Sequence, residues 1–134
     1  GFAIWELIKA DLDRRCDIIN SSGADMVISI HQNSYVTPKA EGAQVFYYKK
    51  SEESKRIAQI MQGILGEKLG TTRQIKSDVN YYILLHSKLP TIISECGFLS
   101  NPEEEQRLCT EEYQEKVADA LYCGIIEYLM MNMK

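Results

Sequence analysis

The sequence predicts an α/β domain built around one buried strand, and three observations lead to that prediction. A helical pattern over 11–21 ends near Gly23 and is followed by an apolar run, 25–31, as in one half of a parallel α/β unit. A second apolar run, 90–93, leads directly to the carboxylate of Glu95. The residues after Glu95 include a Gly for a turn, a Phe-Leu pair that anchors the turn, and a helix start. The carboxyl end of a buried strand is where α/β proteins collect functional groups.

Composition limits the classes of protein to consider. The chain has 134 residues, of which 45% are apolar and 25% charged, as expected for one globular domain. Its net charge of −4 argues against nucleic-acid binding, which usually needs a basic face. No window approaches the roughly 18 uninterrupted apolar residues of a membrane span. The chain begins without Met and shows no signal peptide, and we expect it to be the remnant of a longer protein.

The first third of the chain alternates helix and strand. Residues 1–9 are apolar but irregular and are interpreted as a loop or a short helical lead-in. The helix over 11–21 follows from apolar residues at helical spacing, and Gly23 suits a left-handed cap. In 25–31 neighbouring residues are both apolar, which predicts a strand buried on both faces. That strand ends at His31, in the same kind of position as Glu95.

The middle of the chain reads as loop, strand and helix. The polar stretch 35–41 predicts a loop, and 42–48 predicts a second strand. Ser51 then starts a long helix that ends near Gly70. The helix has an apolar stripe made of Ile57, Ile60, Met61, Ile64 and Leu65.

The remaining elements follow from turn and cap signals. Polar residues 73–80 predict a loop across the mouth of the site, and 81–85 is a short strand candidate. Asn101, followed by Pro and two Glu residues, is a helix-start signature. The acidic side chains there favour the helix dipole, which explains them without a function. Thr110 caps a last helix over 111–131.

Two side chains at strand ends could carry chemistry. Neutral imidazole is the commonest protein ligand for metals, so His31 is either a metal ligand or a structural rim residue. Glu95 is placed to act as a general base in metal-assisted hydrolysis. A catalytic zinc usually needs three protein ligands, so His31 alone is not sufficient. His86 is interpreted as an exposed loop residue or, alternatively, as a substrate contact.

The cysteines fit no common zinc spacing. They are expected to be free and mostly buried thiols, with a disulfide or a metal role as the alternative. A nucleophilic role for Cys96 lacks an apparent oxyanion loop and a third, orienting residue. The four residues are Cys16, Cys96, Cys109 and Cys123.

Several motifs, in order, resemble one known family. Ser-Ile-His-Gln-Asn at 29–33, Gly-Ala-Gln-Val-Phe at 42–46 and the run at 90–101, which contains Glu-Cys-Gly-Phe-Leu-Ser-Asn, resemble the zinc-dependent N-acetylmuramoyl-L-alanine amidases. The helix over 11–20, with its Arg pair, looks like the one that precedes the family's Ser-Ile-His strand. The family cuts peptidoglycan between muramic acid and the stem peptide. The form of these motifs is most similar to the branch that processes spore cortex.

The resemblance implies a fold and roles for three residues. The family fold is a mixed, mostly parallel sheet flanked by helices on both faces. His31 matches a zinc ligand, and Glu95 matches the catalytic glutamate that activates the zinc-bound water. Asn33 matches a motif position near the metal and is given a supporting role. Peptidoglycan is the implied partner, and the implied location is outside the cytoplasm, in the cell wall.

One departure from the family pattern changes the expectation for this chain. The family's first strand, with an Asp-Pro-Gly-His-Gly-Gly type motif, and the ligand Glu on its following helix are not in the sequence. We therefore expect 1–134 to be the C-terminal majority of one amidase catalytic domain, with poor zinc binding and little activity. A missing strand would also expose a sheet edge, through which copies of the chain could associate.

Three hypotheses follow. The first is an enzyme, a peptidoglycan amidase. The second is a catalytically inactive module that still binds peptidoglycan. The third is a plain α/β domain in which His31 and Glu95 are incidental, and the ordered motifs argue against it.

Overall fold

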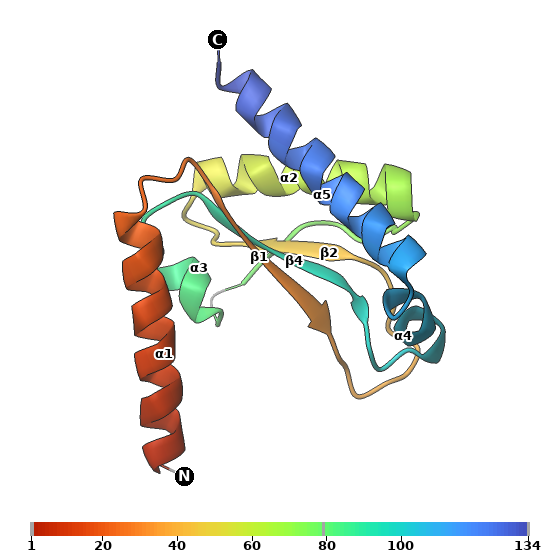
Figure 1. The fold of residues 1–134 in the computed structure, drawn as a ribbon, viewed down its shortest axis with the longest axis horizontal. Coiled ribbons are helices and arrows are strands. Elements are labelled where there is room, and N and C mark those ends of the chain that lie inside the picture. The colour runs from red at the N-terminus through yellow and green to blue at the C-terminus, as the bar shows by residue number, and fades with distance from the viewer. Residues whose placement is uncertain (1, 79, 134) are drawn as a thin grey trace.

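A computed structural model describes residues 2–78 and 80–133 and shows a four-stranded sheet with helices on both faces (Figure 1). The mixed α/β architecture predicted from the sequence is thereby confirmed. Gly1 and Val79, which belong to the predicted 1–9 and 73–80 segments, lie outside the described residues. The elements in chain order are α1 (Phe2–Ser21), β1 (Val27–Asn33), β2 (Gln44–Tyr47), α2 (Glu52–Leu69), β3 (Lys76–Ser77), α3 (Tyr82–His86), β4 (Thr91–Phe98), α4 (Pro102–Leu108) and α5 (Glu111–Met131).

The strand order is β1-β4-β2-β3, so β4 lies inside the sheet. β1 pairs with β4, and β2 with β3, in parallel, whereas β2 and β4 are antiparallel. Helices α2 and α5 pack on one face around Val45, Ile92 and Met61. On the other face Phe46 and Ile93 pack with Leu84 of α3, against which α1 lies. No helix among the described residues has the length and hydropathy needed to cross a membrane.

The two strands that the sequence predicts to be buried differ in how far they are buried. All eight residues of β4 are buried, because strands cover both its edges and helices cover both its faces. The prediction for β1 was wrong, because β1 lies at the sheet edge and Ile30 is 62% exposed. β4 also continues to Phe98 through Gly97, where a turn was expected. The register against β1 slips by one residue there, which is a β-bulge.

The helix caps were predicted correctly. The side chain of Ser51 accepts from the backbone N–H of Ser54 at the start of α2, and Thr110 caps α5 in the same way. Asn101 accepts from the N–H groups of Glu103 and Glu104, with Pro102 at the first position of α4. These side chains satisfy helix N–H groups that have no partner within the helix. Gly70 ends α2 at φ 78°, and Gly23 follows the end of α1 at φ 71°.

Two local predictions were wrong. The stretch 81–85 is not a strand but the N-cap and first residues of helix α3, whose Leu84 is buried against the sheet. The stretch 73–80 contains the short strand β3, paired with β2. In both cases the local sequence was compatible with either state, and contacts with other elements decided. Of the two alternatives for 1–9, the described residues take the helical one, because α1 runs without a break from Phe2 to Ser21.

Candidate active site

β4 aligns three polar side chains in one row across the sheet. Glu95 is the register partner of His31 in β1 on one side and of Gln44 in β2 on the other. Residues directly opposite each other in neighbouring strands project from the same face. The row therefore lies on the face that carries α3, and the structure brings together the two candidate residues that the sequence placed 64 positions apart.

Glu95 is buried but incompletely paired. Its side chain is 4% exposed, and its Oε1 accepts a hydrogen bond of 3.2 Å from the hydroxyl of Tyr81. Its other oxygen, Oε2, is buried and has no hydrogen-bond partner. Burial raises the pKa of Glu95, while the charge of His31 and the hydrogen bond from Tyr81 act to lower it. A carboxylate with one free oxygen and a raised pKa can accept a proton from a substrate or from water.

Tyr81 was missed by the sequence reading, which placed it in a strand. It is the residue before α3, and its ring packs edge to face with the Phe46 ring at a centroid distance of 5.5 Å. Burial, followed by the nearby charge of Glu95, raises the pKa of Tyr81 to about 12. The hydroxyl is thus protonated at neutral pH and serves as a donor.

Gln44 connects the row that contains Glu95 to the guanidinium of Arg73. Its Oε1 accepts a hydrogen bond of 3.2 Å from Nη1 of Arg73, and Nε of Arg73 donates to the carbonyl of Glu41 at 2.5 Å. The guanidinium lies 4.8 Å from the centre of the Phe98 ring. From the sequence, the alternation of side chains along the strand 42–48 could have predicted that Gln44 and Phe46 share one face. The contact with Arg73 could not be predicted, because it depends on the fold.

His31 is exposed, and its Nε2 lies 2.7 Å from the hydroxyl of Ser29. In the described part of the chain, no group of three or more His, Cys, Asp or Glu side chains could hold a metal ion. The residues present therefore do not fit a resident catalytic zinc, which needs about three protein ligands. Asn33 accepts a hydrogen bond of 2.8 Å from the N–H of Ser34 and ends β1.

The other residues considered as candidates, the cysteines and His86, lie where a structural role explains them. The thiol of Cys96 points into the core between the sheet, α2 and α5, and burial raises its pKa to about 11. It is therefore a thiol rather than a nucleophilic thiolate at neutral pH. Cys16 is also buried, Cys109 is exposed, and all four cysteines are free. His86 is exposed at the end of α3, where its ring lies 4.1 Å from that of Tyr82.

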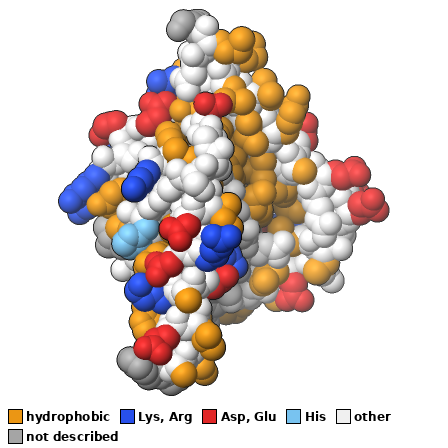
Figure 2. Space-filling model, turned by 60° about the vertical axis from the view of Figure 1, so that its left-hand side comes forward, with side chains coloured by type: hydrophobic (Ala, Val, Ile, Leu, Met, Phe, Trp, Pro, Cys, Tyr) orange, Lys and Arg blue, Asp and Glu red, His pale blue; other side chains and the backbone are white. Residues whose placement is uncertain are grey.

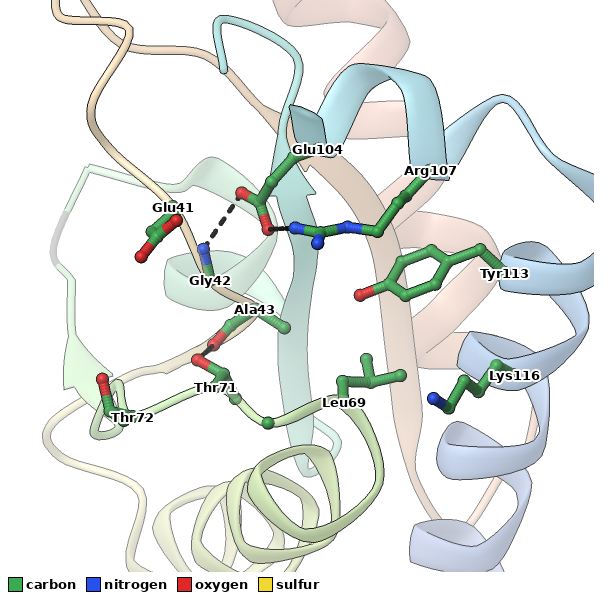
Figure 3. Close-up of a pocket in the computed structure, with 11 residues that line it drawn as sticks. Glu41, Gly42, Ala43, Leu69, Thr71, Thr72, Glu104, Arg107, Tyr113 and Lys116 are labelled. Atoms are coloured by element: carbon green, nitrogen blue, oxygen red, sulfur yellow. Dashed lines mark hydrogen bonds and ion pairs between the residues drawn. The ribbon is translucent and has the colours of Figure 1, made fainter. Parts of the chain in front are cut away.

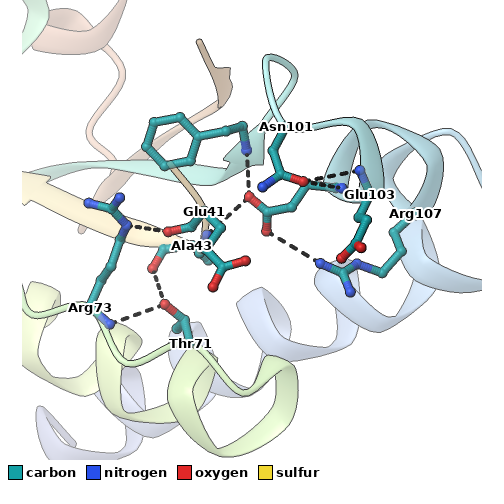
Figure 4. A network of polar contacts seen from close by, with 10 residues as sticks. Glu41, Ala43, Thr71, Arg73, Asn101, Glu103 and Arg107 are labelled. Carbon is teal, nitrogen blue, oxygen red and sulfur yellow. Dashed lines mark hydrogen bonds and ion pairs between the residues drawn. The ribbon is translucent and has the colours of Figure 1, made fainter. Parts of the chain in front are cut away.

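Glu104 of α4 ties the end of β4 to the segment that precedes β2. Figure 4 shows the polar network around these contacts, with Arg107 on the α4 side and Glu41 in the segment before β2. Its Oε1 accepts hydrogen bonds of 3.0 Å from the backbone N–H groups of Gly42 and Phe98. Glu104 is 5% exposed, and Nη2 of Arg107 lies 3.8 Å from its Oε2. The sequence reading attributed this carboxylate to the helix dipole alone, whereas its main contacts hold together the two segments that flank Glu95 and Gln44.

A polar pocket of about 420 Å³ adjoins Glu104 (Figure 3). Tyr113 and Lys116 of α5 direct their polar ends into it, opposite Thr71 and Leu69. Ala43, the residue before β2, also lines it, and its neighbour Gln44 projects from the opposite face of the sheet. The pocket is therefore separate from the row that contains Glu95.

The fold and the row that contains Glu95 and His31 define a mixed α/β domain with a buried carboxylate beside an imidazole at paired strand positions. The protein family described as N-acetylmuramoyl-L-alanine amidase matches residues 7–127, and the chain belongs to that family. The germination-specific N-acetylmuramoyl-L-alanine amidase of Bacillus subtilis strain 168 is 41% identical over 119 residues, which cover 88% of this chain and 50% of the relative. The chain thus spans about half the length of that relative.

Solved structures of amidases share the fold. The CwlD amidase of Clostridioides difficile, in complex with the GerS lipoprotein, superposes with a TM-score of 0.88 at 38% identity, covering 92% of this chain and 64% of that one. An N-acetylmuramoyl-L-alanine amidase of Clostridium difficile 630 has a TM-score of 0.83 at 33% identity, covering 88% and 64%. The expected family membership is confirmed.

Proposed function

We propose that this chain is the C-terminal majority of a peptidoglycan amidase domain, which hydrolyses the amide between N-acetylmuramic acid and L-alanine. The observation that carries the proposal is the buried Glu95 beside His31, with one carboxylate oxygen unpaired, in a chain of the amidase family. A carboxylate oxygen without a hydrogen-bond partner is available to accept a proton, which is what a general base needs.

Glu95 would act as general base and then as general acid. Its unpaired Oε2 takes a proton from the water that attacks the amide carbonyl, and the same proton passes to the leaving nitrogen as the C–N bond breaks. The hydroxyl of Tyr81 donates to the other oxygen, Oε1, so that Oε2 is the oxygen left to accept a proton. Burial raises the pKa of Glu95 and so favours its protonated form, which is the form that gives the proton to the leaving nitrogen.

Zinc dependence is a further part of the proposal, with His31 as one ligand. Because the described residues supply one suitable imidazole and not three ligands, we expect this chain alone to bind zinc weakly. Isothermal titration with ZnCl₂ tests this, with the His31→Ala variant as control. Tight one-to-one binding that His31→Ala abolishes would contradict the expectation.

Activity is best tested in two matched proteins. The first is this chain, and the second is a fusion in which the amino-terminal part of the Bacillus subtilis germination-specific amidase precedes it. We expect new free amino groups from purified peptidoglycan with the fusion and few with the chain alone. Glu95→Gln in the fusion should lower the rate by about 100-fold or more. A fusion that folds but releases no amino groups would contradict the amidase proposal.

The incomplete ligand set favours a second candidate, an inactive peptidoglycan-binding module. Sedimentation with insoluble peptidoglycan separates the two. Retention of the chain on peptidoglycan, together with an inactive fusion, would favour the binding module.

Location and partners complete the proposal. Several relatives are named as cell wall amidases and one as germination-specific, which supports a role in cell-wall or spore-cortex peptidoglycan outside the cytoplasm. The GerS complex is that of the Clostridioides difficile protein. The exposed outer edge of β1 supports self-association of this chain.

A further inference from the structure

The polar pocket beside Glu104 has the size of a small-ligand site. Its volume is about 420 Å³, and its lining residues come from the segments 41–43, 69–72 and 104–116. None of these residues belongs to α1 or β1. Figure 2, in which the α1 side is turned forward, shows hydrophobic side chains gathered in a long hollow. In contrast, most of the residues that line the polar pocket carry charged or hydroxyl groups, so it suits a polar ligand.

Three donors on the α4 and α5 side of this pocket lack a close acceptor in the described part of the chain. The ion pair between Nη2 of Arg107 and Oε2 of Glu104 is long, at 3.8 Å. Neither Nζ of Lys116 nor the hydroxyl of Tyr113 forms an ion pair or a hydrogen bond with a described residue. Burial raises the pKa of Tyr113, although the charge of Arg107 acts to lower it, so this hydroxyl is protonated at neutral pH. Two cations and a hydroxyl donor can together bind a carboxylate.

The pocket also has a negative side. Glu41 lies across from Tyr113 and Lys116 (Figure 3), and its carboxylate forms no ion pair with the described residues. Oε2 of Glu104 adds a second, only weakly paired carboxylate oxygen. These charges would repel a phosphate dianion, whereas a ligand with both an ammonium group and a carboxylate is attracted by both sides. The charge pattern therefore favours a zwitterion.

The lining of the pocket is held in place by contacts within the protein. Oγ1 of Thr71 donates to the carbonyl of Ala43 at 2.8 Å and accepts from the N–H of Arg73 at 3.2 Å. Gly42 has a φ of 97°, and a Cβ there would lie 2.8 Å from Oγ1 of Thr71. Glycine thus allows the segment before β2 to approach the segment after α2 closely. A pocket that is already formed loses little ordering entropy when a ligand binds.

We propose that this pocket binds a short zwitterionic peptide, with the peptide carboxylate at Lys116 and Arg107 and the peptide ammonium group at Glu41. The proposed amidase reaction releases stem peptides in which the amino group of L-alanine has become free, so that reaction supplies a ligand of this class. The source of the peptide therefore rests on the proposed function. Because the pocket is separate from the row that contains Glu95, a peptide bound there leaves the site of the reaction open.

Isothermal titration of the chain with L-alanyl-L-alanine tests the proposal. We expect saturable one-to-one binding with a dissociation constant below about 1 mM. Acetylation of the amino end, or amidation of the carboxyl end, should weaken binding by about tenfold or more, because each removes a charge-assisted contact. No saturable binding of the dipeptide, or equal binding of the two blocked forms and the free dipeptide, would overturn the proposal.

Free L-alanine is the other source of the same chemistry. It should bind more weakly than the dipeptide, because its ammonium group and its carboxylate are too close together to reach both sides of the pocket. Tighter binding of L-alanine than of the dipeptide would overturn the assignment to a peptide.

Two variants test where the charges of the ligand lie. Lys116→Gln should weaken binding of the free dipeptide by about tenfold and leave that of the amidated form unchanged, since the amidated form has no carboxylate. Glu41→Gln should likewise weaken the free dipeptide and leave the acetylated form unchanged. Lys50→Gln and Glu115→Gln are the matched controls, because both residues are exposed and do not line the pocket. Equal effects of the pocket variants and the controls would contradict the proposed placement.

The binding measurement can fail or hold independently of the activity assay. Binding of the dipeptide by the chain, together with an inactive fusion, would contradict the amidase proposal and support the pocket as a peptide site. An active fusion, together with no dipeptide binding, would overturn the inference about the pocket and leave the amidase proposal intact.

Discussion

The hydroxyl of Tyr81 donates a hydrogen bond of 3.2 Å to Oε1 of Glu95, and this contact leaves Oε2 as the free oxygen of a buried carboxylate. The two residues come from different elements, since Tyr81 precedes α3 and Glu95 lies in β4. The packing of Tyr81 against Phe46 thus sets the direction in which Glu95 can react.

Tyr81→Phe removes the donor and leaves both oxygens of Glu95 buried without that hydrogen bond. We expect the free energy of unfolding to fall by about 1–2 kcal/mol, the cost of an unsatisfied buried group. Urea denaturation measures it. Tyr122→Phe is the matched control, because Tyr122 is 63% exposed and should change stability little. Equal stability of the two variants would contradict a role for Tyr81 in holding Glu95.

Glu95→Gln should stabilise the fold at neutral pH while removing the base. Burial raises the folded-state pKa of Glu95, so its stabilising contribution is full below the unfolded pKa and is lost as pH rises through the folded value. The variant should therefore exceed the wild type by about 1 kcal/mol at pH 7, and this advantage should vanish at acid pH. Thermal unfolding from pH 4 to 8 measures it. A difference that does not change with pH would contradict the raised pKa.

Glu104→Ala should be strongly destabilising, because the N–H groups of Gly42 and Phe98 lose their acceptor. We expect a loss of about 3 kcal/mol in the free energy of unfolding. Glu103→Ala is the control, since Glu103 is an exposed carboxylate in the same helical turn, and it should cost less than about 1 kcal/mol. Similar losses would mean that the helix dipole, and not the two backbone contacts, accounts for Glu104.

Thiol reactivity should separate the cysteines. At pH 8 we expect exposed Cys109 to react first with a disulfide reagent, and buried Cys96, with a pKa of about 11, to react only on unfolding. Mass spectrometry of partly labelled protein identifies the order. Rapid labelling of Cys96 in the folded chain would reopen a nucleophilic role for this residue.

Much of the fold could be predicted from short stretches of the sequence. The caps at Ser51, Asn101 and Thr110 depend on side chains within one turn of their targets, and β4 was visible as an apolar run ending at Glu95. Tyr81 was misread because its stretch has both strand and helix composition. Its state depends on the packing of α3 against the sheet.

The sequence by itself determined the α/β class, the candidate pair His31 and Glu95, and the family resemblance, because these rest on short motifs and on apolar periodicity. Only the tertiary structure decided that Tyr81 and Gln44 flank Glu95, that Glu104 holds two distant backbone segments, and that β1 is an edge strand. The physical reason is that strand order and hydrogen bonds between remote residues depend on how elements pack, which no single stretch of sequence encodes.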